Sequence, residues 1–388
     1  MANRRKNRKK SDKQLLLALG TIIGTAVGAG TFGLPYVASK AGFFPVLGMF
    51  VVLGIFTVYT NLMYGEVALR TRKSCRLTGY AGQYLGIWGK RFASAVAFFS
   101  LYSSVLVYII LGGVFLNSLL SGFLGGDEFL YGVAIFVFIS TAAYFNLNLF
   151  CLIESYLVFF MLVAMSVIML KAAPHIDVNN FMTADPSYFF LPFGTILFAL
   201  SATMAIPEFE HIMDKSRNRI KGAILGGTVS YIAIYLLFII AILGVTGPST
   251  SEESFAGLSL FIGDGVITLG LLFGLLAVVT SYLMMAISIK EIFMYDYKIG
   301  EKLSWFLSCF FPFAVFVAGM RNFIQVLNIA GSVMGGFIGI LIILIFYRAK
   351  KNGDVKPAYS IEVSESFSAL MIFIYLLGII YQFIYKNW

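Results

Sequence analysis

The first long apolar segment of the chain is crowded with residues that interrupt helices. Segment 15–38 contains Gly24, Gly28, Gly30, Gly33 and Pro35. In a helix interior, glycine costs about 1 kcal/mol and proline about 3 kcal/mol, and proline also lacks a backbone donor. Gly20, Gly24 and Gly28 recur every four residues, which close helix packing also explains. The cluster from Gly30 to Pro35 predicts an unwound stretch, whose free backbone groups are suited to bind a charged small molecule.

A second interruption of this kind lies in segment 189–213. Ser201 and Thr203 precede Pro207 and Glu208 there, so hydroxyls that can bond to freed carbonyls stand beside a residue that stops the backbone ladder. This segment is the sixth apolar run and the other is the first. An offset of five makes the two runs enter a membrane from opposite sides, as an inverted repeat requires. Paired interrupted helices in corresponding positions indicate a transporter's binding site.

The elements that carry these residues must be membrane helices. Hydrophobic residues make up 59% of the 388 residues and charged residues only 12%, with a mean hydropathy of +0.88. Such runs of about 20 apolar residues predict spanning helices rather than strands of a barrel. Eleven candidate spans are predicted, at 15–38, 44–69, 92–122, 129–148, 152–172, 189–213, 221–246, 266–290, 303–320, 325–347 and 367–385. The sequence therefore predicts an all-α integral membrane protein.

Basic residues indicate how these spans are oriented. Of the 28 Lys and Arg residues, all but Lys40, Lys171, Arg321 and Lys386 fall in alternate links, counted from the N-terminus. The positive-inside rule then places the N-terminus in the cytoplasm and the C-terminus outside. We expect a multi-pass protein of the plasma membrane. Its predicted parts are a basic cytoplasmic tail (1–14), two five-helix repeats (15–172 and 189–347), a cytoplasmic loop (348–366) and an eleventh helix with a short C-terminus (367–388).

Composition argues against several other classes of protein. Three separated cysteines and two histidines provide neither a disulfide framework nor a metal-ligand pattern. No nucleophile, metal cluster or paired acid and base indicates an enzyme, and no organic cofactor is expected. The basic N-terminus is expected to lie near anionic lipid of the bilayer, so no nucleic-acid partner is predicted. A channel, or a sensor that transports nothing, remains an alternative.

The two interrupted spans resemble the amino acid–polyamine–organocation superfamily, in particular its amino acid/auxin and hydroxy/aromatic amino acid permease branches. The resemblance rests on Gly28-Ala-Gly30-Thr-Phe-Gly33-Leu-Pro35-Tyr36, on Phe193–Glu208, and on the glycines Gly331, Gly335 and Gly336 of the tenth span. It implies the LeuT-type fold, a bundle of five plus five helices in inverted repeats, here with an eleventh helix and with spans one and six discontinuous. It also implies a monomer that carries an amino acid by alternating access.

The same resemblance implies where the amino acid binds. Its carboxylate would meet the amides of Ala29 and Gly30, and its amino group the carbonyls of Phe198 and Ala199. Phe198 would cover the site, although ordinary packing explains that residue equally well. Tyr102 and Tyr108 are candidates from the third span, whose register the sequence leaves open. The predicted substrate site comprises Ala26, Gly28, Ala29, Gly30, Thr31, Tyr102, Tyr108, Phe198, Ala199, Ser201, Ala202 and Thr203.

A sodium site is predicted on the eighth span. Ala277, Thr280 and Ser281 share one helical face, and hydroxyl and carbonyl oxygens are the ligands that alkali cations prefer. The resemblance completes this site with the carbonyls of Gly24 and Val27. Hydroxyls that bond back to their own helix are the alternative. A second sodium site of the resembled family would fall at Thr31 and Ala199, where the missing hydroxyl at 199 argues against it.

Proton coupling is the alternative to sodium, with Glu66 and Glu208 as possible relays. The sequence thus predicts a secondary active amino acid transporter, a symporter coupled to one sodium ion. The small residues Ala29, Ala199 and Ala202 would leave room for a neutral substrate that is bulky or aromatic, and the resemblance adds hydroxylated amino acids as candidates. The stretch 249–263 is expected to form a short helix over the outer mouth.

Overall fold

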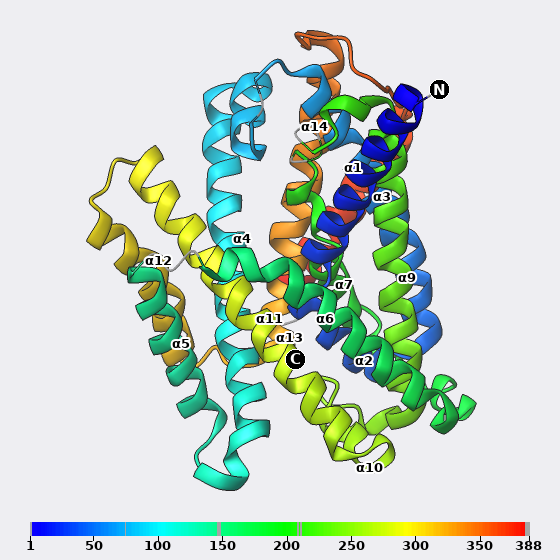
Figure 1. The fold of residues 1–388 in the computed structure, drawn as a ribbon, viewed down its shortest axis with the longest axis vertical. Helices are drawn as coiled ribbons and strands as arrows, with labels where there is room; N and C mark the ends of the chain where they lie inside the picture. The colour runs from blue at the N-terminus through cyan, green and yellow to red at the C-terminus, as the bar shows by residue number, and fades with distance from the viewer. Residues whose placement is uncertain (1, 74, 146–148, 208, 210–211, 385–388) are drawn as a thin grey trace.

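The computed structural model describes residues 2–73, 75–145, 149–207, 209 and 212–384, which form a bundle of helices without a strand (Figure 1). Six of the described helices are long and apolar enough to cross a membrane, and a bent pair forms a seventh candidate. Two shorter apolar helices accompany them. Among the described residues, each of the eleven predicted spans contains helical backbone, and the sixth is interrupted after Ala199.

The α-helices are α1 (Ala2–Ala26), α2 (Ala29–Ala41), α3 (Phe43–Arg70), α4 (Leu77–Leu124), α5 (Glu128–Tyr144), α6 (Leu149–Ala172), α7 (Leu191–Ala199), α9 (Ile220–Thr246), α10 (Ser259–Ile262), α11 (Asp264–Glu291), α12 (Glu301–Val317), α13 (Phe323–Ile329), α14 (Gly336–Asn352) and α15 (Glu365–Ile384). Short 3₁₀ turns are η1 (Ala173–His175), η2 (Val178–Phe181), η3 (Pro186–Tyr188), η4 (Ala202–Ala205), η5 (Asp214–Arg219), η6 (Gly247–Ser249) and η7 (Ala256–Leu258). Two π-helical turns, η8 (Ile292–Asp296) and η9 (Ala330–Gly335), extend α11 and join α13 to α14.

The first span is broken, as predicted, but the break lies earlier than the glycine and proline cluster indicates. The helices α1 and α2 meet at an angle of 56°, and the residues between them are Val27 and Gly28. Gly30, Gly33 and Pro35 lie inside α2, so the predicted unwound stretch from Gly30 to Pro35 is wrong. These small residues stay helical because α2 packs tightly on other helices. A Cβ atom on Gly33 would lie 2.8 Å from the Leu327 side chain of α13.

The sixth span is broken at its middle. The helix α7 ends at Ala199, and the chain continues through Leu200 and Ser201 into the 3₁₀ turn η4. The α7 helix is held from behind by the tenth span, whose backbone widens into the π-helical turn η9. A Cβ atom on Gly331 would overlap the Gly194 carbonyl of α7. A glycine is therefore required at position 331 for this close approach.

Some element bounds differ from the prediction. The third span begins at Leu77, and Gly86 interrupts its helix with a positive φ of 75°, which a glycine adopts readily. The basic tail 1–14 continues the first helix from Ala2 onward. The predicted loop 348–366 is shorter, because α14 runs to Asn352 and α15 begins at Glu365.

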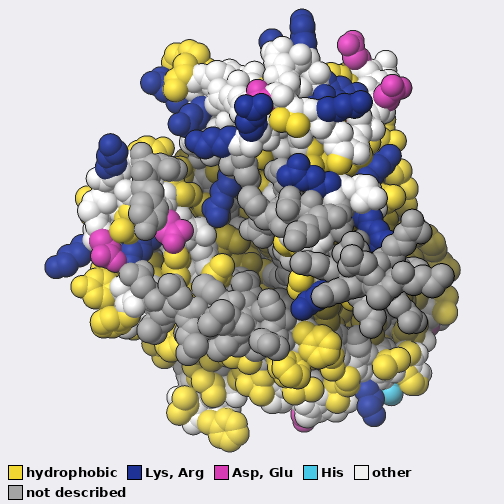
Figure 2. Space-filling view, turned by 45° about the horizontal axis from the view of Figure 1, so that its top comes forward, with side chains coloured by type: hydrophobic (Ala, Val, Ile, Leu, Met, Phe, Trp, Pro, Cys, Tyr) yellow, Lys and Arg dark blue, Asp and Glu magenta, His cyan; other side chains and the backbone are white. Residues whose placement is uncertain are grey.

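Links expected on the cytoplasmic side meet at one end of the bundle, the end where the chain begins. Asp12 of α1 pairs with Arg219 of η5 at 2.8 Å. The backbone amides of Asp354 and Val355 donate to the carbonyl of Arg70. Lys and Arg side chains gather over this end of the molecule (Figure 2). The spans thus alternate in direction, as an inverted repeat requires.

Candidate functional site between two broken helices

A cavity of about 140 Å³ lies where the breaks of the first and sixth spans meet. Since one water molecule occupies about 30 Å³ of liquid, this cavity has room for a small organic molecule or several waters. Predicted site residues that line it are Ala26, Gly28, Ala29, Gly30, Tyr108, Phe198, Ala199, Ser201 and Thr203. Nine of the twelve predicted substrate residues are therefore brought together at one cavity.

The two broken helices touch each other at this cavity. A Cβ atom on Gly30 would lie 2.8 Å from the Ala199 Cα, so only glycine fits at position 30 without displacing α7. The helix α2 starts at Ala29, and no side chain in the described part of the protein caps its N-terminus. The first amides of a helix have no partner within it, and they carry the positive end of the helix dipole. The cavity is therefore suited to bind a carboxylate at Ala29 and Gly30.

The C-terminal end of α7 contributes carbonyl groups to the same region. The Ser201 amide donates to the Phe198 carbonyl at 3.1 Å, and the Ser201 hydroxyl donates to the Leu197 carbonyl at 2.7 Å. Helix C-terminal carbonyls carry partial negative charge. A donor-bearing cation such as an ammonium group is the natural partner for this end. The cavity thus lies between the positive N-terminal end of α2 and the negative C-terminal end of α7.

One face of the third span lines the cavity, and the sequence analysis did not establish which face this is. Ser100, Ser104 and Tyr108 recur every four residues and line it together. Tyr102 lies on the opposite face, and its hydroxyl donates to the Leu307 carbonyl of α12 at 3.1 Å. Placing Tyr102 at the cavity is therefore wrong. In the sequence, the only hint of this face is the four-residue spacing of Ser100, Ser104 and Tyr108.

Further lining residues come from helices that the sequence analysis did not connect to the site. Thr57 and Thr60 of α3 contribute hydroxyls, and Tyr375 of α15 approaches Thr60 at 3.4 Å between hydroxyl oxygens. Met285 of α11 and the tenth-span residues Ala330, Gly335, Ile338 and Gly339 complete this part of the wall. Gly335 belongs to the glycine pattern noted in the sequence. Nothing in the sequence connects α15 to the site.

Two other predicted substrate residues lie behind the cavity wall. Thr31 is fully buried in α2, and Ala202 is fully buried in η4. Neither lines the cavity. Each follows a lining residue by one position, so the direction of the helix or turn takes its side chain away from the cavity.

The cavity opens toward the end of the bundle where the chain begins. Thr25, just before the break in the first span, is exposed, and so is Ser201, just after α7. The opposite side is closed by three buried phenylalanines. The Phe32 ring lies 5.2 Å from the ring of Phe115 and 5.4 Å from that of Phe255. Access is therefore one-sided in this conformation.

The segment expected to cover the outer mouth lies over α2. Between η6 and η7, the Ser254 hydroxyl donates to the Phe32 carbonyl. Glu252, in the same loop, accepts a hydrogen bond from Asn322 at 3.1 Å. Burial raises the pKa of Glu252, and the nearby carboxylates Glu253 and Glu128 raise it further. This loop carries the predicted short helix as α10.

Glu66 does not reach the cavity, so a proton relay through it is not supported by its position. Its carboxylate is fully buried and pairs with Arg70 at 2.8 Å. It also accepts hydrogen bonds from the Ser360 hydroxyl at 2.9 Å and the Ile361 amide at 2.7 Å. These contacts fasten the link between α14 and α15 to α3. Glu208, the other predicted relay, lies outside the described residues.

The predicted sodium ligands on α11 are partly engaged with their own helix. The Thr280 hydroxyl donates to the carbonyls of Leu276 and Ala277, both at 3.1 Å. Donation uses the hydroxyl hydrogen and leaves oxygen lone pairs for a cation. Ser281 is half-buried beside it. The donor set fits an alkali cation, and its convergence with the Gly24 and Val27 carbonyls stays a prediction.

Comparison with known proteins decides the family. The model of the tryptophan/tyrosine permease family matches residues 11–382, nearly the whole chain. The chain belongs to this family. Among curated proteins, this permease is 24% identical over 355 residues to the tyrosine-specific transport system 1 of Haemophilus influenzae, covering 85% of this chain and 87% of that protein. It is 25% identical over 370 residues to the tyrosine-specific transport system 2 of the same organism, covering 87% and 88%.

A third relative has a different named substrate. The permease is 23% identical over 366 residues to the glutamine transporter 2 of Aliivibrio fischeri, covering 88% of this chain and 91% of that protein. Among solved structures, it resembles MhsT in complex with L-phenylalanine, with a TM-score of 0.63 at 14% identity over 95% of this chain and 98% of that chain. The fold is therefore the LeuT-type helical bundle. The protein is a multi-pass membrane transporter and not an enzyme.

Proposed function

We propose that this permease is a secondary active symporter that carries a neutral, preferably aromatic, amino acid by alternating access, coupled to one sodium ion. One observation supports this best: the uncapped N-terminus of α2 and the carbonyl end of α7 meet at one cavity, in contact at Gly30 and Ala199. A zwitterion has one group for each of these ends. The α-carboxylate binds the amides of Ala29 and Gly30, and the α-ammonium group binds at the end of α7.

The walls of the cavity favour an aromatic side chain. Small residues leave space beside the α2 break, while Tyr108, Phe198 and Tyr375 offer ring faces and edges. Hydroxyls of Thr57, Thr60, Ser100 and Ser104 offer partners to a phenol or an indole N–H. Two relatives are named as tyrosine-specific transport systems, which also favours an aromatic substrate. The glutamine transporter among the relatives makes glutamine the substrate to compare.

One-sided access supports alternating access. The cavity communicates with the end of the bundle that carries the basic N-terminus, and three packed phenylalanines close the other side. A carrier needs a second conformation in which this closure reverses. The break in each of the two spans supplies a hinge, because the half-helices on either side are joined by only two residues. We expect the N-terminal end to face the cytoplasm.

Sodium is proposed as the coupled ion because of α11. Thr280 and Ser281 place two hydroxyls and the Ala277 carbonyl on one face, and these are hard oxygen ligands. Proton coupling through Glu66 is less favoured, since its carboxylate is engaged with Arg70, Ser360 and Ile361.

Uptake into proteoliposomes tests this proposal. Purified permease would be reconstituted and supplied with radiolabelled tyrosine, tryptophan or glutamine, with a sodium gradient or a pH gradient imposed separately. We expect accumulation of tyrosine or tryptophan that follows the sodium gradient and exceeds that of glutamine. Accumulation driven by the pH gradient alone in sodium-free buffer would overturn the sodium assignment. No accumulation of any of the three under either gradient would overturn the transport proposal.

A further inference from the structure

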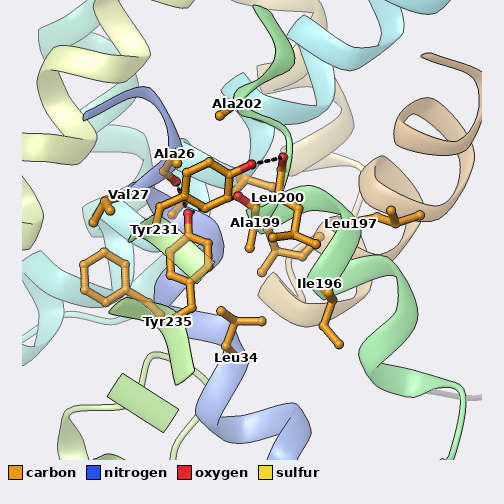
Figure 3. Packing of buried hydrophobic residues seen from close by; sticks show 14 of the residues in the cluster. Ala26, Val27, Leu34, Ile196, Leu197, Ala199, Leu200, Ala202, Tyr231 and Tyr235 are labelled. Carbon is orange, nitrogen blue, oxygen red and sulfur yellow. Dashed lines mark hydrogen bonds between the residues drawn. The ribbon is translucent and has the colours of Figure 1, made fainter. Parts of the chain in front are cut away.

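Two tyrosines of α9 contact both broken helices from the side away from the cavity. Tyr231 and Tyr235 are one helical turn apart and fully buried. The Tyr235 hydroxyl donates a hydrogen bond to the Ala26 carbonyl and lies 3.0 Å from the Ala199 carbonyl, to which it can also donate (Figure 3). Ala26 is the last residue of α1 and Ala199 is the last residue of α7. One side chain thus bridges the C-terminal ends of two half-helices.

These two helix ends need such a bridge. The last carbonyls of a helix have no partner within it and carry partial negative charge. Two such ends brought together in a buried place repel each other unless a donor or a cation lies between them. A phenol has one hydrogen to donate, so Tyr235 shares it between the two carbonyls. The bridge is neutral and requires no ion.

Tyr231 continues the same arrangement one turn earlier on α9. Its hydroxyl donates weakly to the Leu200 carbonyl at 3.4 Å, just past the end of α7 (Figure 3). The Asn61 side-chain amide of α3 donates to the Tyr231 hydroxyl at 3.4 Å and to the Thr228 hydroxyl at 3.1 Å. The Asn61 carbonyl oxygen accepts from the Thr203 hydroxyl at 2.9 Å. Tyr231 is therefore anchored to α3 as well as to the sixth span.

We propose that Tyr235, with weaker help from Tyr231, is a positioning residue that sets the relative placement of α1 and α7 at the substrate cavity. Tyr235 does not itself line the cavity, whereas both of its acceptors, Ala26 and Ala199, do. Tyr235 therefore affects the binding of an amino acid indirectly, by fixing the backbone positions of Ala26 and Ala199. The expected consequence for substrate affinity rests on the proposed function, but the consequence for the backbone does not.

The test compares two Tyr-to-Phe variants at fully buried positions, one whose hydroxyl bridges the broken spans and one whose hydroxyl does not. Tyr235→Phe removes the bridge. Tyr282→Phe is the matched control: Tyr282 of α11 is fully buried too, and its hydroxyl has no hydrogen-bond partner among the described residues. Hydrogen–deuterium exchange of detergent-purified protein would be followed in peptides covering residues 22–30 and 197–203. Equilibrium binding of labelled L-tyrosine, L-tryptophan and L-glutamine would be measured on the same preparations.

We expect exchange in both peptides to be several-fold faster in Tyr235→Phe than in the wild type, and unchanged in Tyr282→Phe. We expect the Kd of the ligand that the wild type binds to rise about tenfold in Tyr235→Phe, while that of Tyr282→Phe stays within about twofold. Equal exchange in the two variants would overturn the positioning role. If the wild type binds none of the three amino acids, the proposed function fails, and the exchange comparison still decides the role of Tyr235.

A milder variant keeps the test decisive if Tyr235→Phe cannot be purified. Tyr231→Phe loses two long contacts, the one to the Leu200 carbonyl and the one from the Asn61 amide, and it keeps the Tyr235 bridge. It should accelerate exchange at residues 200–203 and leave residues 22–30 as in the wild type. Unchanged exchange at 200–203 in this variant would then contradict the proposal.

Discussion

Gly30 of α2 and Ala199 of α7 are in backbone contact: a Cβ atom on Gly30 would lie 2.8 Å from the Ala199 Cα and 3.1 Å from the Ala199 amide nitrogen. This contact brings the positive start of one half-helix to the negative end of another. The helix α7 cannot move away from α2 easily, because Gly331 of η9 packs against its other side at Gly194. The geometry of the cavity therefore depends on this one crossing.

Gly30→Ala should disable the permease while leaving it folded. The added methyl group forces α2 away from α7 at a cost of about 1–3 kcal/mol. Because 1.4 kcal/mol corresponds to a factor of ten, we expect uptake per folded molecule to fall at least about tenfold. Gly20→Ala is the control, since a Cβ atom there meets nothing within 4 Å. Equal uptake by the two variants would contradict the crossing as a functional contact.

Tyr108→Phe and Tyr102→Phe should differ in substrate affinity. Tyr108 lines the cavity, and its hydroxyl lies 3.6 Å from the position of a Cβ atom on Gly28. Losing a hydrogen bond of about 1 kcal/mol corresponds to a KM about fivefold higher. Tyr102 bonds to α12 instead, so Tyr102→Phe should leave KM unchanged. Initial rates of tyrosine uptake in proteoliposomes measure both, and a reversed order would place the third span in the other register.

Thr280→Ala should weaken the response to sodium if α11 holds the ion. Removing one oxygen ligand raises the sodium concentration that gives half-maximal uptake, and we expect a shift of about tenfold, equal to about 1.4 kcal/mol. Thr268→Ala is the matched control, because Thr268 of the same helix also bonds back to its own backbone, at an exposed position. A sodium titration of uptake compares them. An unshifted curve for Thr280→Ala would argue against this site.

Glu66→Gln should affect stability rather than coupling. The substitution removes the charge that faces Arg70, and loss of one partner of a buried ion pair destabilises by several kcal/mol. Arg70 is partly exposed, so we expect about 2 kcal/mol, seen as a lower Tm of the detergent-purified protein. The pH profile of uptake per folded molecule should match that of the wild type. A flattened profile would instead support the proton relay.

The sequence was sufficient to predict the elements and the pairing of the broken spans, because apolar run length and glycine and proline content are local properties. It misplaced the break in the first span, since the same small residues are required for close packing inside α2. Which face of the third span meets the cavity depends on neighbouring helices, so the sequence left both Tyr102 and Tyr108 as candidates. Tyr375 and Tyr235 were missed because tyrosines in membrane helices commonly serve as interface or packing residues.

The central claim is that bare backbone of two half-helices holds the zwitterion, and an experimental density map of the permease with bound tyrosine tests it most directly. We predict ligand density between α2 and α7, with the carboxylate within about 3 Å of the Ala29 and Gly30 amide nitrogens. Tyrosine bound elsewhere, or first and sixth spans that run unbroken past Gly28 and Ser201, would contradict this account.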